Sequence, residues 1–225
     1  MEIKLLSKLS RDYVEQLLSG IPFFKLVKQQ DSWQFELLLQ ASRIVTYLPG
    51  EIVLQRGDSD QWLFFLLKGR LAVYVDDPLK GELINYVTPG EVFGDLAQLM
   101  GQPRTATVLA EPSCRESIVL ATDASIFGDI SSTRPITVQT KLAYYRNTVH
   151  NLRWKLEVYR SQHLKHSLAN KHRQEKLYTG VKETLEELRA LHEQAQALAG
   201  LLLEWNSEFG ALGDESVPPQ DAYNL

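Results

Sequence analysis

Short apolar runs separated by turn residues fill the middle of the chain. Glycine or proline marks most of the gaps, as in Pro49-Gly50 and Pro89-Gly90. Many short strands at regular spacing with such corners predict an antiparallel barrel or roll. Almost every residue of 62–67 is apolar, which predicts a strand buried on both faces. The predicted strands are 44–48, 51–55, 62–67, 71–75, 83–87, 91–93, 105–109 and 117–120.

Helical spacing precedes and follows these strands. Apolar positions within 3–19 predict a helix with one buried face, which Gly20 and Pro22 end. The segments 33–41 and 124–130 predict two further short helices.

Two apolar seams occupy the last part of the chain. Pro135 suits the first position of a helix, with Ser132 or Thr133 as its cap. Alternating spacings of four and three then predict a coiled coil, interrupted near Gly180 by a change of register. Either one long helix passes Gly180, or the chain folds back there as a helical hairpin. The first seam is Val138, Leu142, Tyr145, Val149, Leu152, Leu156 and Tyr159. The second is Leu177, Val181, Thr184, Leu188, Leu191, Ala195, Leu198, Leu202, Trp205 and Phe209.

Charge is segregated along the sequence. Residues 1–133 carry a net charge of −5, residues 134–176 carry +8, and residues 177–225 carry −7. Such asymmetry is typical of a partner surface or of pairing within the molecule. The opposite charges of the last two blocks favour helices that lie alongside each other, within one chain or between subunits.

The predicted fold class is therefore α+β. We expect an antiparallel β-roll or jelly-roll with flanking helices over residues 1–130 and a long basic dimerisation helix over 131–176. An acidic coiled-coil helix over 177–210 and a disordered acidic tail over 211–225 complete the predicted organisation.

Composition narrows the class further. A hydrophobic content of 44% is enough for a real core. The single cysteine, Cys114, excludes an intramolecular disulfide and fits a reducing compartment. The N-terminal stretch has no uninterrupted apolar core, and no apolar run approaches the length of a membrane span. We expect a soluble, cytoplasmic protein.

Candidate chemistry gathers between residues 90 and 108. Gly94 permits a tight turn, and a helix opening at Asp95 would direct its first N–H groups outward, where they can bind an anion. Arg104 follows about one helix-length later and can place a planar fork of donors on the same anion. This combination predicts a phosphate site.

The chain resembles the cyclic nucleotide-binding domain family over about residues 5–160. The resemblance rests on Phe93-Gly94-Asp95-Leu96-Ala97 and Pro103-Arg104-Thr105-Ala106-Thr107-Val108. Pro49-Gly50-Glu51, Gly57 and Gly69 at strand corners support it. It implies a β-roll whose following helix closes over the base and, in the catabolite-activator branch, forms a dimer.

The resemblance also implies a set of ligand-binding residues. Backbone groups of Gly94, Leu96 and Ala97 and the guanidinium of Arg104 would hold the cyclic phosphate, with Thr105 near the phosphate or base. Tyr144 and Thr148 would meet the base.

Asp95 departs from the family, which usually has glutamate there to accept the ribose 2′-hydroxyl. Aspartate is one methylene shorter and can instead cap its own helix. Loss of that hydrogen bond would cost about 1.5–3 kcal/mol, roughly ten- to a hundredfold in affinity. The expected ligand is cAMP, with cGMP or a cyclic dinucleotide as alternatives.

The output is expected to be a protein contact. We predict a homodimer through 138–159 and a partner protein through 177–209, with no transmembrane segment. The acidic residues after 177 disfavour direct DNA binding. An adaptor with a degenerate pocket, or a nucleic-acid binder that uses the basic helix, are the other hypotheses.

No enzyme is expected from this sequence. It offers no nucleophile–base pair and no paired-carboxylate cleft. His163 and His166 lie one helical turn apart, but no third ligand accompanies them, so we predict no metal site.

Overall fold

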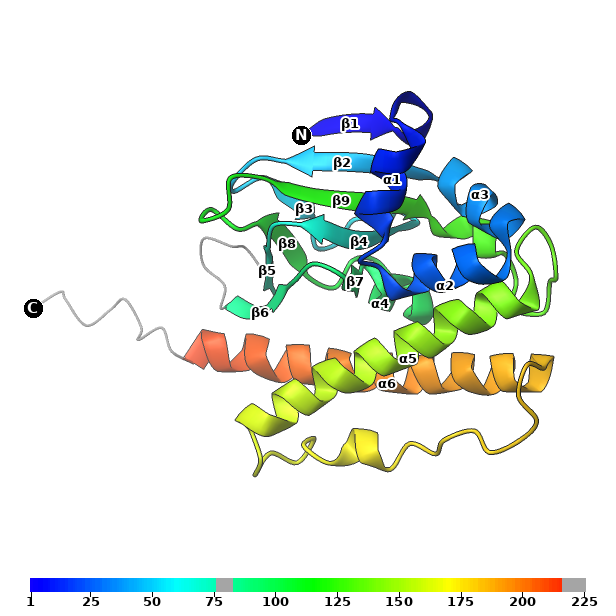
Figure 1. Cartoon of the computed structure of the whole chain (residues 1–225). Coiled ribbons are helices and arrows are strands. Elements are labelled where there is room, and N and C mark those ends of the chain that lie inside the picture. The colour runs from blue at the N-terminus through cyan, green and yellow to red at the C-terminus, as the bar shows by residue number, and fades with distance from the viewer. Residues whose placement is uncertain (76–82, 216–225) are drawn as a thin grey trace, which may run out of the picture.

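The computed structural model describes residues 1–75 and 83–215, with side chains to Glu208. Two antiparallel sheets with helices around them confirm the predicted α+β class (Figure 1), and we call the two sheets together the roll. The first sheet has the order β1 (Glu2–Leu5), β2 (Ser42–Tyr47), β9 (Ser117–Asp123), β4 (Trp62–Lys68) and β7 (Val92–Phe93). The second has the order β3 (Ile52–Leu54), β8 (Thr107–Ala110), β5 (Leu71–Tyr74) and β6 (Leu83–Val87).

Strand β4 is buried on both faces, as its apolar sequence predicts. Leu63 and Phe65 belong to the core shared with the N-terminal helices. Phe64 and Leu66 belong to the core enclosed by the two sheets. Because alternate side chains of a strand point to opposite faces, one continuous apolar run serves both cores.

The prediction of a single helix over 3–19 is wrong in its first half. Residues Glu2–Leu5 form β1, a 3₁₀ turn follows over Leu6–Lys8, and α1 covers only Arg11–Leu18. Strand β1 pairs antiparallel with β2, with Ile3 opposite Val45. Tertiary hydrogen bonding to a neighbouring strand therefore overrides the helical spacing of the apolar residues.

Two helices complete the N-terminal layer, α2 (Pro22–Gln30) and α3 (Ser32–Gln40), the latter close to its predicted range. Phe23 and Phe24 of α2 pack on Phe65 of β4, with ring centroids 6.0 and 5.1 Å apart. Burial of these rings fixes the helical layer against the first sheet.

Helix α5 (Val138–Gln162) begins later than predicted. Thr137 is its cap, and the Thr137 hydroxyl oxygen accepts a hydrogen bond from the Thr140 N–H at 3.3 Å. Gln34 of α3 holds the preceding segment, because its side chain donates to the Pro135 carbonyl and accepts from the Thr137 N–H. These bonds keep residues 135–137 outside the helix, so the predicted start at Pro135 is wrong.

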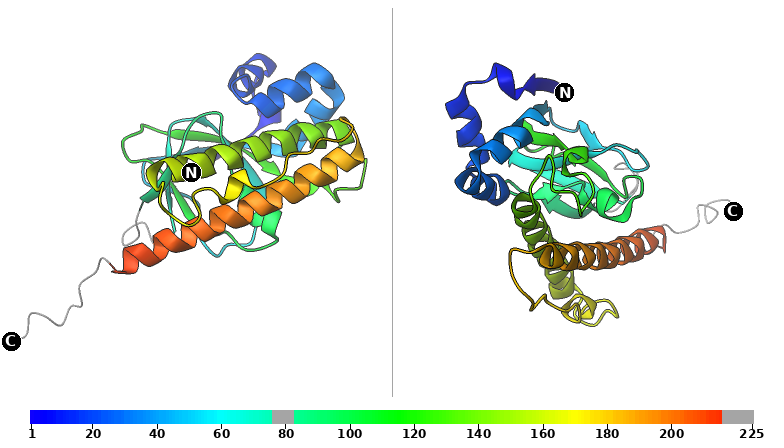
Figure 2. Two further views of the ribbon diagram at one scale, coloured as in Figure 1. Left: turned by 90° about the horizontal axis from the view of Figure 1, so that it is seen from below. Right: turned by 90° about the vertical axis from the view of Figure 1, so that its right-hand side faces the viewer.

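Helix α6 (Leu185–Glu215) runs alongside α5 in the same direction (Figures 1 and 2). Arg146, early in α5, bonds Glu187 at the start of α6, and Tyr159, late in α5, stacks on Trp205. The connection over 163–184 returns along α5 and contains only the 3₁₀ turn Lys171–Arg173. The chain is therefore neither one long helix nor a hairpin hinged at Gly180.

The two predicted seams meet each other within one chain. The face of α5 expected to form a homodimer is covered by α6. At the other end of the second seam, Leu177 and Val181 lie in the connection, 69% and 74% exposed, so they are not seam residues here. The mutually packed residues include Leu142, Val149, Leu152, Leu156 and Tyr159 with Leu188, Ala195, Leu198, Leu202 and Trp205.

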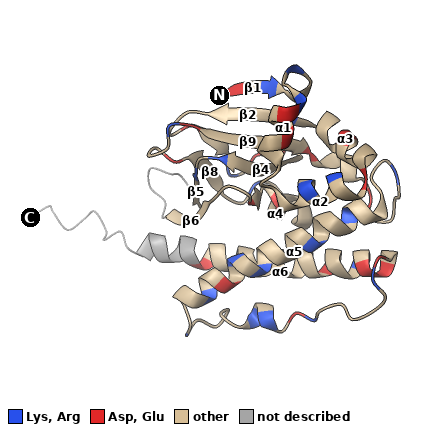
Figure 3. Cartoon of the chain, viewed as in Figure 1, with Lys and Arg blue, Asp and Glu red and all other residues tan. Residues whose placement is uncertain are grey.

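Opposite charges accompany this packing, as the block charges predict (Figure 3). Lys171 pairs with Glu204 at 2.9 Å, and Arg146 pairs with Glu183 and Glu187. Of the predicted tail, residues 211–215 belong to α6, and the rest lies outside the described residues. Within the described part of the chain, no helix is long and apolar enough to cross a membrane.

Candidate ligand-binding site

A glycine turn and a short helix form the centre of the site, as the sequence predicts. Strand β7 ends at Phe93, Gly94 adopts φ +81°, and α4 (Asp95–Met100) begins at once. Glycine is required at 94 because a Cβ there would lie 2.8 Å from the Arg104 Nη1 atom and 3.3 Å from Phe64. The turn therefore brings backbone and guanidinium close together.

Arg104 is buried and held by several acceptors. Its Nε donates to Asp60 Oδ2 at 3.1 Å, and its Nη2 donates to Asp60 Oδ1 and to the Trp62 carbonyl at 2.5 Å. Its Nη1 donates to the Gly94 carbonyl at 2.6 Å. Four of the five guanidinium N–H groups are thus used within the described protein, and one N–H on Nη1 is left for another acceptor.

Asp60 is the residue that pairs with Arg104. Burial raises the pKa of the Asp60 carboxyl, but the hydrogen bonds from Arg104 and the Trp62 N–H, together with the charges of Arg104 and Arg43, hold the pKa below its usual value. Nothing in the sequence around Asp60 marks it, because it lies 44 residues from Arg104. The ion-pair partner of Arg104 is therefore Asp60.

Asp95 neither caps α4 nor pairs with Arg104. Gly94 occupies the cap position, and no side chain caps the helix. Asp95 is only 1% exposed, and its Oδ2 has no hydrogen-bond partner among the described residues. A buried oxygen without a partner costs about 1–3 kcal/mol, so its position calls for an explanation.

A cavity of about 100 Å³ lies against this turn. It brings together six of the predicted ligand residues with the inner face of the second sheet. From the opposite side, Lys155 and Tyr159 of α5 and Leu202 and Asn206 of α6 reach the same cavity. The predicted residues that line it are Gly94, Asp95, Leu96, Ala97, Arg104 and Thr105.

The cavity therefore has two walls. We call the segment 93–105 with its neighbouring strands the cassette wall. We call the four helical residues Lys155, Tyr159, Leu202 and Asn206 the helical wall. Sequence analysis placed Tyr159 and Leu202 only in seams and did not single out Lys155 or Asn206. The signal that could have found them is weak: each pair is spaced by one helical turn.

Tyr144 and Thr148 lie outside this cavity. The Tyr144 ring packs on Phe127 and Phe23, with centroids 4.7 and 5.9 Å apart. Burial raises the pKa of the Tyr144 hydroxyl far above its usual value. Thr148 is fully buried. The Tyr144 side chain packs in the core shared with the N-terminal helices, and Tyr159, later on α5, reaches the cavity instead.

Few polar bonds join the helices to the cassette wall. Lys155 Nζ donates to the Val92 carbonyl at 3.2 Å, just before the glycine turn. Gln196 Nε2 donates to the Leu99 carbonyl at 3.0 Å, near the end of α4. The strand before the glycine turn and the helix after it are therefore tied to two different helices.

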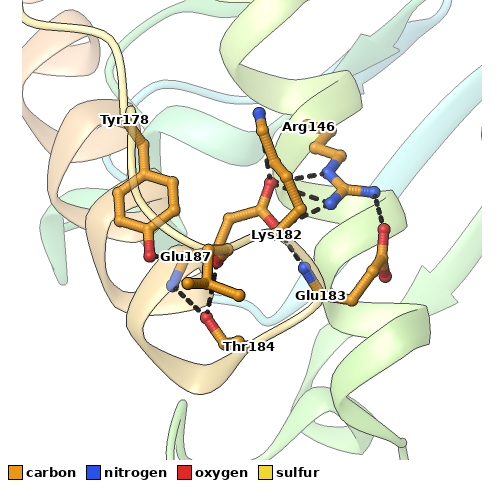
Figure 4. Close-up of polar contacts among 7 residues, drawn as sticks. Arg146, Tyr178, Lys182, Glu183, Thr184 and Glu187 are labelled. Atoms are coloured by element: carbon orange, nitrogen blue, oxygen red, sulfur yellow. Dashed lines mark hydrogen bonds and ion pairs between the residues drawn. The ribbon is translucent and has the colours of Figure 1, made fainter.

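The beginning of α6 is anchored far more firmly (Figure 4). Glu187 is buried, and its carboxylate accepts two hydrogen bonds from Arg146 Nη2, at 2.7 and 2.8 Å, and one from the Glu183 N–H at 2.7 Å. Burial raises the pKa of Glu187, but the hydrogen bonds from Arg146 and the Glu183 N–H, together with the charges of Arg146 and Lys182, hold that pKa below its usual value. Thr184 caps the helix through its hydroxyl.

The histidines of the basic segment serve packing. His166 lies 4.5 Å from the Trp205 ring, and His172 bonds Glu157 at 2.8 Å. Among the described residues, no group of three or more His, Cys, Asp or Glu side chains could hold a metal ion.

Comparison with known families agrees with this geometry. Residues 44–133 match the model of the cyclic nucleotide-binding domain. The match contains the glycine turn, Asp95 and Arg104, and it ends before α5.

The relatives match only part of this chain. A cGMP-dependent protein kinase of Plasmodium berghei is 33% identical over 78 residues, 35% of this chain and 9% of the kinase. The cAMP-dependent protein kinase type II regulatory subunit of Drosophila melanogaster is 28% identical over 102 residues, 44% of this chain and 26% of that protein. The matches to cGMP-dependent kinases span about a tenth of their length.

Solved structures of related proteins extend over more of the chain. The structure described as cAMP-bound PfPKA-R (141–441) is 25% identical, covers 66% of this chain and 47% of its own, and has a TM-score of 0.47. The regulatory subunit of a cAMP-independent protein kinase A from Trypanosoma brucei is 20% identical, with 68% and 51% coverage and a TM-score of 0.49.

Proposed function

We propose that this protein is a cytoplasmic sensor of a cyclic nucleotide, which binds in the cavity between the cassette wall and the helical wall. Occupancy is relayed through α5 and α6 to a protein partner. The family of residues 44–133 supports the ligand class, and the helical wall supports the relay.

The unpartnered Asp95 carboxylate is the observation that carries this proposal. Its Oδ2 is buried beside the cavity without a hydrogen-bond donor among the described residues. A ribose 2′-hydroxyl would supply the missing donor, and the bond to a charged acceptor contributes about 1.5–3 kcal/mol. A chain with no ligand for this site would gain stability by replacing the aspartate.

Arg104 would hold the phosphate by charge and by its remaining N–H. Its other bonds fix the guanidinium plane before any ligand arrives, which reduces the entropy lost on binding. Pre-organisation of this kind suits an anion site built on a rigid sheet.

The relay follows from the size of the cavity. Pockets for small molecules usually enclose about 300–1,000 Å³, and this one encloses about 100 Å³. A bound nucleotide would therefore displace the helical wall from the cassette wall. The Lys155 and Gln196 bonds to the cassette would change in that movement. The ligand shifts the helices only as far as its affinity differs between their two positions.

We extend the proposal to the partners. Separation of α6 from α5 in the nucleotide-free protein would expose the apolar face of α5 over 138–159 for a homodimer, and residues 177–209 for a partner protein. A bound nucleotide would displace α5 and α6 together and keep them paired. In the structure α6 covers the 138–159 face, so dimerisation through it requires α6 to move.

Direct titration tests the ligand. Calorimetry with cAMP, cGMP and a cyclic dinucleotide should reveal binding by at least one. Asp95→Asn should weaken it roughly ten- to a hundredfold, because an amide is a weaker acceptor for the ribose hydroxyl than a carboxylate. The melting temperature should not fall, because Oδ2 has no hydrogen bond to a described residue to lose. Asp12→Asn on the exposed face of α1 is the matched control. Failure of all three nucleotides to bind would end the sensor hypothesis.

The second candidate is an adaptor whose pocket no longer binds a ligand. The hydrogen bonds of Arg104 favour an adaptor, because four of the five guanidinium N–H groups already donate to protein acceptors. An adaptor predicts that Asp95→Asn leaves partner assembly unchanged, whereas charge reversal at Glu204 or Glu208 weakens it. A sensor predicts that added nucleotide changes partner assembly in the wild type, and that Asp95→Asn reduces this change.

A further inference from the structure

The helical wall of the cavity carries polar groups that the phosphate site does not use. Lys155 and Tyr159 lie one turn apart on α5, and Leu202 and Asn206 lie one turn apart on α6. Because the phosphate would lie at the glycine turn and Arg104, the base of a nucleotide would extend toward this opposite wall. This inference rests on the proposed function and concerns which base the wall admits.

The Asn206 amide has a defined orientation. The Tyr159 hydroxyl donates to Asn206 Oδ1 at 3.3 Å. The amide oxygen already accepts this bond, whereas the Nδ2 group donates to no described residue and has both N–H groups for a ligand. An amide nitrogen only donates hydrogen bonds.

Lys155 adds a second donor to the same wall. Its ammonium group can only donate, and in the structure it bonds the Val92 carbonyl at 3.2 Å. That single long bond leaves further N–H groups on Nζ for a ligand. Among the described residues that line the cavity, Asp95 is the one acidic side chain, and it belongs to the cassette wall.

A wall that offers donors matches one purine better than the other. The Hoogsteen edge of guanine presents two acceptors, N7 and O6, whereas that of adenine presents the N7 acceptor and the N6 amino donor. Lysine pairs well with the guanine edge. The adenine amino group is itself a donor, so it could not form a hydrogen bond with the donors of Lys155 or the Asn206 amide.

We propose that Lys155 and Asn206 select a guanine base over an adenine base, so that the sensor prefers cGMP to cAMP. Tyr159 acts as a positioning residue, because its hydroxyl turns the Asn206 amide donor toward the cavity. A well-formed pair of this kind discriminates roughly ten- to a hundredfold between bases.

Calorimetric titration of the full chain with cGMP and cAMP is the test. Wild type should bind cGMP roughly ten- to a hundredfold more tightly. Lys155→Met keeps the apolar stem, so it should weaken the binding of cGMP and leave the affinity for cAMP almost unchanged. Asn206→Asp replaces a donor with an acceptor of the same shape and should move the preference toward cAMP. Lys165→Met, in the exposed connection, is the matched control.

The outcomes separate the two levels of the proposal. Tighter binding of cAMP than cGMP by wild type, or equal losses for both nucleotides in Lys155→Met and Asn206→Asp, would overturn base selection while the sensor function stands. Absence of binding by either nucleotide would overturn the sensor function itself. If Asn206→Asp does not fold, Tyr159→Phe supplies the test. Without the Tyr159 hydroxyl the Asn206 amide can rotate, so the preference for cGMP over cAMP should become smaller.

Discussion

The two walls of the cavity differ in how firmly hydrogen bonds hold them. The cassette wall comes from residues 93–105 and is fixed by four hydrogen bonds from one buried arginine, Arg104. The helical wall comes from α5 and α6. One hydrogen bond from Lys155 and one from Gln196 tie these helices to the cassette wall. A rigid wall can hold a phosphate precisely, while a loosely tied wall can move when the ligand arrives.

The largest effect should come from the rigid wall. Arg104→Ala leaves Asp60 and two carbonyl groups without their donor, so we expect a loss of about 4 kcal/mol of stability and no measurable nucleotide binding. Chemical denaturation measures the first and calorimetry the second. Arg104→Lys, which keeps the charge but not the planar fork, should lose less stability. A wild-type unfolding midpoint for Arg104→Ala would mean that the guanidinium network does not hold this wall.

Leu202→Ala tests the movable wall. Leu202 is buried between α5 and the cavity, so its truncation should cost about 3 kcal/mol. Because the variant enlarges the cavity and weakens the helical wall, nucleotide affinity should be unchanged or higher. Leu164→Ala, at an exposed position, is the control. A large drop in affinity with Leu202→Ala would show that the helical wall is as rigid as the cassette wall.

Gly94→Ala should show how far the backbone geometry of the turn, with the charge of Arg104 kept, contributes to nucleotide affinity. The left-handed backbone at residue 94 costs alanine about 1–2 kcal/mol. The added Cβ would also push the Arg104 Nη1 atom, 2.8 Å away, and thereby lower affinity. Gly50→Ala has a similar positive φ but no neighbour within 4 Å, so it should lose stability without losing affinity. Equal binding by both variants would contradict this role for the turn.

The smallest effect concerns the connection behind the helical wall. Hydrogen bonds from Arg173 and His172 lower the pKa of Glu157 to about 2 from a usual value of 4.5. A lowered folded-state pKa contributes stability that is present above pH 4.5 and lost as the pH falls toward 2. Glu157→Gln should therefore flatten the acid limb of a stability profile in that window. An unchanged limb would show that these bonds do not hold the connection in solution.

Several features of the fold could be predicted from local sequence. The strands of the roll follow from apolar runs with glycine and proline corners, and the candidate phosphate site follows from Gly94 and Arg104, which lie within a motif only 11 residues long. What could not be predicted depends on pairing at a distance. Residues 2–5 became β1 because a neighbouring strand was available, and Pro135 stayed outside α5 because Gln34 bonds its carbonyl.

The sequence by itself determined that α5 and α6 carry matching apolar faces and opposite charges, because these properties belong to each helix alone. Only the tertiary structure decided that the helices run in the same direction, that α6 covers the face expected for a dimer, and that Asp60 pairs with Arg104. Heptad spacing specifies which face of a helix is buried but not which helix buries it. That choice depends on where the roll places the ends of α5 and on how far residues 163–184 can reach.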